Sequence, residues 1–144
     1  MKRHPSLIPL SHEHQHGLAL AVMIDRRSKP DAELARDVSA AWESELANHF
    51  RVEEEYVFPL ADQELVGRLL TQHRELEAMV RDVAAAGDDD RRARLEAFSK
   101  RLNEHIRIEE RQLFEQMQES LTAEQLEELG VVVERESRRA CPRS

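Results

Sequence analysis

The sequence predicts an all-α protein, an up-down-up-down four-helix bundle with a short C-terminal extra helix. Charged residues make up 35% of the chain and aromatic residues only 4%, and four glycines and five prolines leave long runs of Ala, Leu, Glu and Arg, which favour helices. Apolar residues recur at helical spacing in four long segments joined by short connections. Amphipathic helices joined in this way pack as antiparallel neighbours, which predicts the bundle.

Prolines and capping residues set the bounds of the first two helices. Residues 1–9 hold two prolines and are expected to form an extended lead-in, so that the first helix begins at Pro9 or Ser11 and ends within residues 26–30. Asp31 is expected to be the N-cap of the second helix, which continues until Pro59 stops or kinks it.

The third helix follows Asp62 and is expected to end at Gly87 in the left-handed conformation that helix ends favour. The acidic residues 88–90 are expected to cap the fourth helix, which extends beyond Phe114. Thr122 and Gln125 have the spacing of a capping box, which predicts a short fifth helix covering one end of the bundle.

Length and charge restrict the class of protein. With 144 residues the chain is expected to be one domain, with the bundle at about 7–120 and the C-terminal helix and tail at 121–144. A formal net charge of −8 disfavours nucleic acid as a partner, because phosphate binding needs a basic surface. No stretch resembles a signal peptide or a membrane span, so we expect a cytoplasmic protein without membrane association. A single cysteine, Cys141, excludes an internal disulfide and lies in a polar tail expected to be disordered.

A ten-residue pattern occurs twice, as HFRVEEEYVF from His49 and as HIRIEERQLF from His105. Each copy places a histidine and a glutamate four residues apart, His49 with Glu53 and His105 with Glu109, so the two side chains share one helix face. Those faces are otherwise apolar, and a buried histidine and carboxylate are costly unless they are paired. A metal ion suits both ligand types. The alternative, a surface hydrogen bond in a charged helix, fits one copy better than two matched copies.

Two more histidines, His14 and His73, continue the apolar stripes of the first and third helices. Because neighbouring helices run in opposite directions, these positions fall level with the two repeated His–Glu pairs. Four imidazoles and two carboxylates are too many for one structural zinc, which takes four ligands and prefers thiolates. The set predicts two adjacent first-row metals, each bound by two histidines, with both carboxylates bridging.

The ligand on the first helix has rivals, because the stretch SHEHQH contains His12, His14 and His16. Only His14 continues the stripe of Leu10 and Leu18; the other two point about 160° away on a helix with ~3.6 residues per turn. His12 to His16 also spells H-E-x-x-H, a zinc-protease motif. That interpretation has little support, because the pair lies off the apolar stripe with no domain to hold a peptide.

These features resemble the hemerythrin-like, or HHE cation-binding, family. The resemblance rests on a histidine followed by two glutamates on the second and fourth helices, a lone core histidine on the first and third, and the following YVFP and QLF, and it covers about residues 7–120. It implies a four-helix bundle holding an oxo- or hydroxo-bridged di-iron centre. Members are associated with oxygen binding, with oxygen, redox or iron sensing, and with repair of iron–sulfur centres after nitrosative stress. Six residues match the family's motif: His14, His49, Glu53, His73, His105 and Glu109.

The sequence differs from the oxygen-carrying hemerythrins at two positions. Glu77 stands where those carriers have a second histidine on the third helix, and Glu110 stands where they have an aspartate. The resemblance is therefore closer to the iron–sulfur repair and bacterial branches, which argues against reversible oxygen carriage. Glu54 and Glu110 each follow a ligand glutamate and are turned about 100° aside, which predicts a solvated position or a contact behind the ligands.

Glu77 and four other residues are candidates for contacts near the metals. Tyr56 and Gln112 are each seven residues past a ligand histidine, and are either packing residues at a helix end or hydrogen-bond donors to a bound diatomic molecule. Glu45 and Arg101, each four residues before a ligand histidine, are expected to form an ion pair across the bundle.

The expected function is that of a di-iron protein that binds oxygen, nitric oxide or peroxide in a response to oxygen, redox or nitrosative stress. The first alternative is a non-catalytic iron or redox sensor, or an iron-buffering module, whose stability depends on its metal. The second is a bundle that holds zinc or manganese and performs no redox chemistry.

Overall fold

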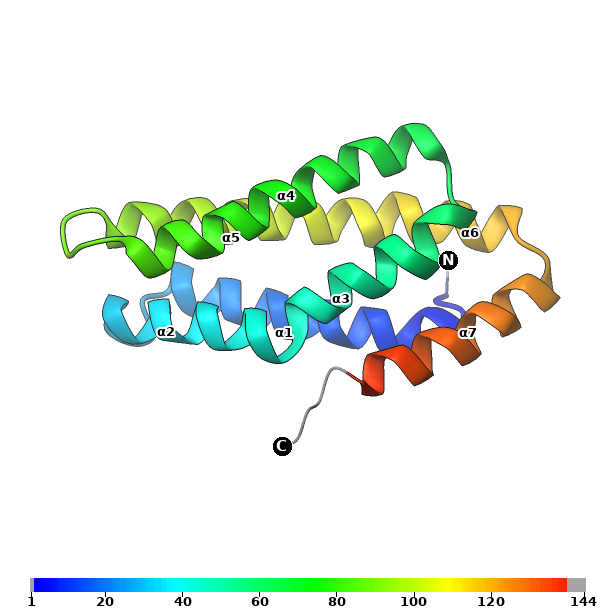
Figure 1. Cartoon of the computed structure of the whole chain (residues 1–144), viewed down its shortest axis with the longest axis horizontal. Coiled ribbons are helices and arrows are strands. Elements are labelled where there is room, and N and C mark those ends of the chain that lie inside the picture. The colour runs from blue at the N-terminus through cyan, green and yellow to red at the C-terminus, as the bar shows by residue number, and fades with distance from the viewer. Residues whose placement is uncertain (1, 140–144) are drawn as a thin grey trace.

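The computed structural model describes residues 2–139, in which the helices that form the bundle can be grouped into four long rods. Figure 1 shows that these rods lie along one axis. Every regular element in this part of the chain is helical, which confirms the predicted all-α bundle with an additional C-terminal helix. The fourth rod packs against the first and the third, and the second rod also packs against these two. The first rod is α1 (Ile8–Asp25), preceded by the 3₁₀ turn η1 (Pro5–Leu7), and the third is α4 (Gln63–Ala85).

The second and fourth rods are interrupted by π-helical turns, which the sequence did not predict. The second contains α2 (Asp31–Ala41), the π turn η2 (Trp42–Leu46), α3 (Ala47–Val52), the π turn η3 (Glu53–Val57) and the 3₁₀ turn η4 (Phe58–Leu60). The fourth contains α5 (Arg91–Ile108), the π turn η5 (Glu109–Leu113) and α6 (Phe114–Ser120).

The turns η3 and η5 occupy equivalent places, because each begins at the glutamate of a repeated His–Glu pair. A π turn accommodates one more residue than an α turn, so side chains beyond it are rotated by about 100°. Val57 and Leu113, eight residues past His49 and His105, are therefore fully buried.

Several predicted helix ends are wrong in detail. The expected lead-in is helical from Pro5 onward, because proline is well tolerated in a first helical turn. Asp31 is the first residue of α2 rather than its N-cap, and its carboxylate accepts from the Arg92 guanidinium. Gly87 does not adopt the left-handed conformation; among the described residues only Arg27, after α1, has a positive φ, of 52°. Asp90 occupies the N-cap position of α5 without capping it through its side chain.

The apolar core consists of two clusters, with polar side chains between them. The first cluster includes Leu20 of α1, and the second includes Leu10. His14 lies between these two leucines in the sequence and is itself buried. The same order holds on α4, where His73 lies between Leu69 and Leu76. Phe98 is fully buried in the first cluster, and the partly buried Trp42 packs against it.

The extra helix, α7 (Ala123–Arg138), begins with the predicted capping box, in which Thr122 Oγ1 accepts from the amide of Gln125 at 3.1 Å. It crosses the outside of the bundle at the end where the N-terminus lies (Figure 1), packing against η1, α1 and α3. Its buried Glu136 accepts from Arg51 of α3 at 3.0 Å. No helix within residues 2–139 combines the length and apolar character that a membrane crossing requires. Cys141 lies outside the described residues.

Candidate metal centre

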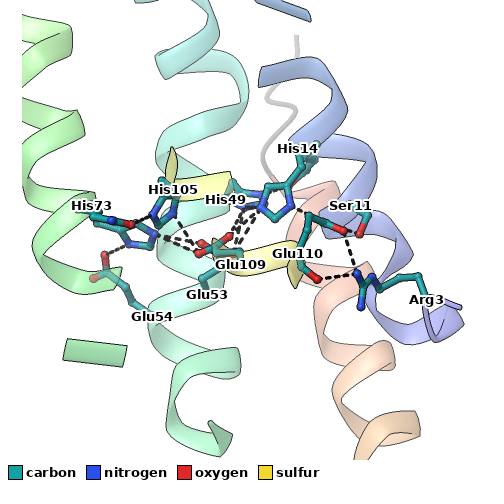
Figure 2. Close-up of polar contacts among 12 residues, drawn as sticks. Arg3, Ser11, His14, His49, Glu53, Glu54, His73, His105, Glu109 and Glu110 are labelled. Atoms are coloured by element: carbon teal, nitrogen blue, oxygen red, sulfur yellow. Dashed lines mark hydrogen bonds and ion pairs between the residues drawn. The ribbon is translucent and has the colours of Figure 1, made fainter. Parts of the chain in front are cut away.

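The six predicted ligands lie between the two core clusters. Figure 2 shows their side chains pointing toward one another. Their side chains are at most 4% exposed. They form two groups of four, in each of which the ligand atoms lie within 4.8 Å of one another, and Glu53 and Glu109 belong to both groups. The predicted convergence of these residues at one height in the bundle is therefore what the structure shows.

The first group contains the histidines of the first and second rods. His49 Nε2 lies 3.2 Å from Glu53 Oε2 and 3.2 Å from His14 Nε2. His14 Nε2 lies 2.7 Å from Glu109 Oε1. The His14 ring is stacked on Phe114, with centroids 5.6 Å apart.

The second group contains the histidines of the third and fourth rods. His73 Nε2 lies 3.1 Å from Glu53 Oε1, and His105 Nε2 lies 3.1 Å from Glu109 Oε2. Each carboxylate thus turns one oxygen toward each pair of histidines. This is the arrangement that two adjacent cations with bridging carboxylates require. Phe50 stacks on the His73 ring with centroids 3.9 Å apart and fixes its plane.

Each of the four candidate ligand histidines is oriented by a residue from the preceding rod, and the fourth rod supplies the partner for the histidine of the first rod. His49 Nδ1 donates to Glu13 at 2.7 Å, His73 Nδ1 to Glu54 at 2.7 Å, His105 Nδ1 to the amide oxygen of Gln72 at 2.8 Å, and His14 Nδ1 to Glu110 at 2.5 Å. We call these four contacts the hydrogen-bond ring. Because a carboxylate can only accept, Nδ1 carries the hydrogen and Nε2 is the atom directed toward the centre.

The charges of the centre are balanced by protons when no cation is present. Burial alone would lower the pKa of His73, but hydrogen bonds with Glu109, Glu53 and Glu54 raise it to about 10. Burial likewise opposes the charged form of His14, whose pKa is nevertheless raised by hydrogen bonds with Glu109 and Glu110. Burial would raise the pKa of Glu109, but the neighbouring histidines, His105 first, hold it well below its usual range. A cation would therefore replace protons at these imidazoles.

The buried polar atoms test whether a metal fits. Glu53 Oε2, Glu109 Oε2 and His105 Nε2 are buried and have no hydrogen-bond partner among the described residues. All three belong to the predicted ligand set, and each points into the groups described above. Unpartnered buried acceptors are costly, and cations held by nitrogen and oxygen ligands would satisfy all three at once. The residues present therefore fit a pair of metal ions.

The rival histidines of the first helix lie elsewhere. His12 is exposed, and His16 is 68% exposed, with Nδ1 donating to Glu45 at 2.9 Å. Among the described residues neither belongs to a group of potential metal ligands, so the zinc-protease interpretation gains no support. His14 alone of the three reaches the centre.

The residues predicted near the metals mostly lie away from them. Gln112 is exposed, so it takes neither of its two expected roles, a packing residue at a helix end or a hydrogen-bond donor at the metals. Tyr56 is half-buried and packs against the second core cluster, in the packing role that was its alternative. Both are displaced by the π turns η3 and η5, which rotate them off the histidine face. Glu77 pairs with Arg81 at 3.2 Å and is 38% exposed.

The predicted ion pair between Glu45 and Arg101 is also wrong. Glu45 accepts from His16, whereas Arg101 pairs with Glu75 at 3.3 Å and with Glu104 at 3.2 Å. Each charged side chain turns to a neighbouring helix at the surface, where water solvates it, because a pair across the bundle would lie in the apolar core.

The sequence did not single out Glu13 and Gln72. A signal for them exists, because each directly precedes the ligand histidine of its own helix, while Glu54 and Glu110 each directly follow a ligand glutamate. A residue one position from a ligand lies about 100° around the helix. It therefore faces the adjacent rod and can reach that rod's histidine.

Among comparisons with known proteins, a family match agrees with this geometry. No curated protein and no solved structure gives a match. The family described as the hemerythrin HHE cation-binding domain matches residues 9–117, which contain all six predicted ligands and the four residues of the hydrogen-bond ring. Because this match spans most of the sequence, the chain belongs to the hemerythrin HHE cation-binding family.

Proposed function

We propose that the protein holds two iron ions and binds oxygen, nitric oxide or peroxide in a response to oxygen, redox or nitrosative stress. The observation that carries the proposal is the pair of ligand groups that share Glu53 and Glu109. Mixed imidazole and carboxylate ligation without thiolate suits iron, zinc and manganese, and of these iron is the metal that commonly binds diatomic molecules. Iron held in this way supplies a redox couple and coordination positions open to a small ligand.

A small cavity beside the centre supports a diatomic ligand. It has a volume of about 10 Å³ and is lined by His14, His49 and His105, by Glu13, and by the apolar side chains Leu46, Phe50, Leu102 and Ile106. This is about the space of one water-sized sphere, so the cavity is confined and has no room for a substrate of several heavy atoms. The apolar side chains keep bulk water from the metals.

The same lining favours binding over turnover. Apart from the imidazoles, its only titratable side chain is Glu13, which already accepts from His49. Reducing a bound molecule requires protons, and a general acid has to lie within hydrogen-bond reach of the reacting atom. Among the described residues, the lining of this cavity therefore offers a small ligand no free proton donor, which fits binding better than turnover.

Anaerobic loading with ferrous iron, followed by exposure to oxygen and separately to nitric oxide, tests the proposal. We expect two iron ions per chain and visible charge-transfer bands that appear on gas binding and reverse on its removal. The His14→Asn variant should lose iron, whereas the matched variant His12→Asn should retain both ions because His12 is exposed. Two bound irons with no spectral response to either gas would refute the gas-binding part.

The unpartnered buried atoms favour one alternative, a sensor or buffer whose stability follows its metal. Glu53 Oε2, Glu109 Oε2 and His105 Nε2 make no hydrogen bond among the described residues, and bound cations would supply partners for all three, so metal binding should stabilise the fold. Strong stabilisation by iron without any gas response would support this alternative. Selective retention of zinc or manganese over iron would instead support a centre without redox chemistry.

A further inference from the structure

Residues 2–7, which we call the N-terminal arm, reach across the end of the bundle to the fourth rod. Arg3 Nη2 donates to the main-chain oxygen of Glu110 at 2.8 Å and to its carboxylate at 3.2 Å, and Nη1 donates to Gln118 at 3.0 Å and to Glu115 at 3.2 Å. The guanidinium lies 5.3 Å from the ring centroid of Phe114. With so many contacts the Arg3 side chain is only 18% exposed. The arm therefore has a defined position on the bundle.

Glu110 connects the arm to the candidate metal centre (Figure 2). Its Oε1 accepts from Arg3, while its Oε2 accepts from His14 Nδ1 at 2.5 Å and from Ser11 Oγ at 2.8 Å. The orientation of the His14 ring thus depends on a carboxylate that Arg3 holds in place. Residues that orient a metal ligand in this way tune metal affinity.

The arm is held in turn by α7. Leu7 is fully buried in the second core cluster together with Leu129 and Val133 of α7. Gly130 makes this close approach possible, because a Cβ at this position would lie 2.8 Å from Ser6 Cβ and 3.1 Å from Ser6 Cα. The main chain of Ser6 would then have to move.

In the second ligand group, Arg74 holds Glu54 in the way that Arg3 holds Glu110 in the first. Arg74 donates to both oxygens of Glu54, at 3.1 and 2.9 Å, and Glu54 accepts from His73. Arg74 directly follows His73 on the same helix and is 62% exposed. Arg3 and α7, in contrast, lie outside residues 9–117, the part matched by the family. The two groups are therefore held by separate parts of the chain.

We propose that Arg3 is a positioning residue that acts through Glu110 on His14, and that the N-terminal arm and α7 together set the metal affinity of the first ligand group. This inference rests on the proposed two-metal function. It assigns to the two terminal segments the control of one metal position, while the other is held within the bundle.

Titration of the metal-free full chain with Zn²⁺, in competition with a chromophoric chelator, tests the proposal without any redox reaction. We expect two equivalents to bind the wild type. Glu110→Gln should weaken one equivalent by about 10- to 100-fold, the range for residues that orient a ligand, and Arg3→Gln should weaken the same equivalent by about 3- to 10-fold. Arg3→Lys should restore part of the loss. The double variant R3Q/E110Q should bind no more weakly than E110Q, because both changes interrupt one connection.

Other variants separate positioning from a general effect on folding. Gly130→Ala should weaken the same Zn²⁺ equivalent as Arg3→Gln does, because it displaces the N-terminal arm. Gly67→Ala should leave the binding of both equivalents unchanged, because a Cβ at Gly67 meets nothing within 4 Å. Arg74→Gln should weaken the other equivalent, so that R3Q/R74Q weakens both. Glu115→Gln, which removes the charge of one Arg3 partner that has no hydrogen bond to His14, should change neither equivalent.

Two results would overturn the inference while leaving the two-metal function intact. Unchanged binding of both equivalents by Arg3→Gln would show that Glu110 needs no support from the arm. Equal weakening of both equivalents, with a lower unfolding temperature, would show that Arg3 only stabilises the fold. A wild-type protein that fails to bind two ions would refute the two-metal function itself, and the inference with it.

Discussion

The metal-free and metal-loaded forms should respond to pH in opposite ways. In the metal-free protein the pKa of His73 is raised to about 10, because its hydrogen bonds with Glu109, Glu53 and Glu54 outweigh the effect of burial. In the unfolded chain the pKa of a histidine is about 6.5. The stabilisation that His73 contributes is therefore complete below about pH 6.5 and is lost as the pH rises toward about 10.

The magnitude follows from proton linkage. Between these two pKa values the folded protein binds one more proton than the unfolded chain, so the free energy of unfolding falls by about 1.4 kcal/mol per pH unit. From about pH 7 to about pH 9, His73 alone accounts for a loss of about 2–3 kcal/mol. His14 and His49, whose pKa values are also raised, act in the same direction.

Metal removes this loss, because coordinated imidazoles are neutral in the folded protein and are also neutral in the unfolded chain above about pH 6.5. The stability of the loaded form should be flat from about pH 7 to about pH 9. It should fall below about pH 6.5, where the unfolded histidines take up protons.

Urea unfolding followed by the fluorescence of Trp42, the only tryptophan, measures both forms, with chelator and with excess Zn²⁺. His73→Gln should reduce the metal-free slope, and the exposed His16→Gln should not. The reasoning fails if the metal-free protein is as stable at about pH 9 as at about pH 7, or if His73→Gln leaves the slope intact.

Three further predictions concern the ligands and the cavity. Glu53→Gln and Glu109→Gln should each lower the metal count measured by elemental analysis below two per chain, because each glutamate serves both groups, whereas Glu77→Gln, on the surface beside Arg81, should leave it unchanged. Gln72→Glu should tighten the binding of one Zn²⁺ equivalent by about tenfold in chelator competition, because a hydrogen bond to a carboxylate makes His105 a more basic metal ligand than a hydrogen bond to an amide does. Weaker binding would contradict this. Gly17→Ala should weaken nitric oxide binding without changing the iron count, because the new Cβ would lie 3.1 Å from Cδ1 of Ile106, which lines the cavity. Equal affinity in a spectrophotometric titration would show that Ile106 can move without narrowing the cavity.

The placement of the six candidate ligands could be predicted from the sequence because two independent signals agree. Hydrophobic periodicity gives the inward face of each helix, and the repeated pattern from His49 and His105 gives the height. His14 could be chosen over His12 and His16 on the apolar stripe alone, and its burial in the centre agrees with that choice.

The π turns could not be predicted, because an α turn and a π turn use nearly the same backbone conformation and differ in which carbonyl each amide reaches. Glu53 and Glu109 have ordinary helical φ and ψ angles, so nothing local in the sequence marks the extra residue. The four histidines and the two glutamates therefore lie where the sequence placed them, whereas Tyr56 and Gln112, which follow the glutamates, lie off the histidine face.

The partners behind the histidines were missed for a different reason. Glu13 and Gln72 contact histidines on neighbouring rods, 36 and 33 residues away in the sequence. A single helix shows which side chains share its own face, but not which ones meet between helices. The direction of these contacts became clear only when the order of the rods around the bundle was known.

The hydrogen-bond ring has a consequence for assembly. Each histidine is oriented by a residue of an adjacent helix, and His14 of the first rod needs Glu110 of the fourth. Neither the hairpin of the first two rods nor that of the last two therefore contains a complete metal site. Cations can then be captured with full strength only after both hairpins have docked, which makes metal uptake a late step in folding. Either hairpin, produced as a separate peptide, should bind metal weakly, and mixing the two peptides should restore tight binding.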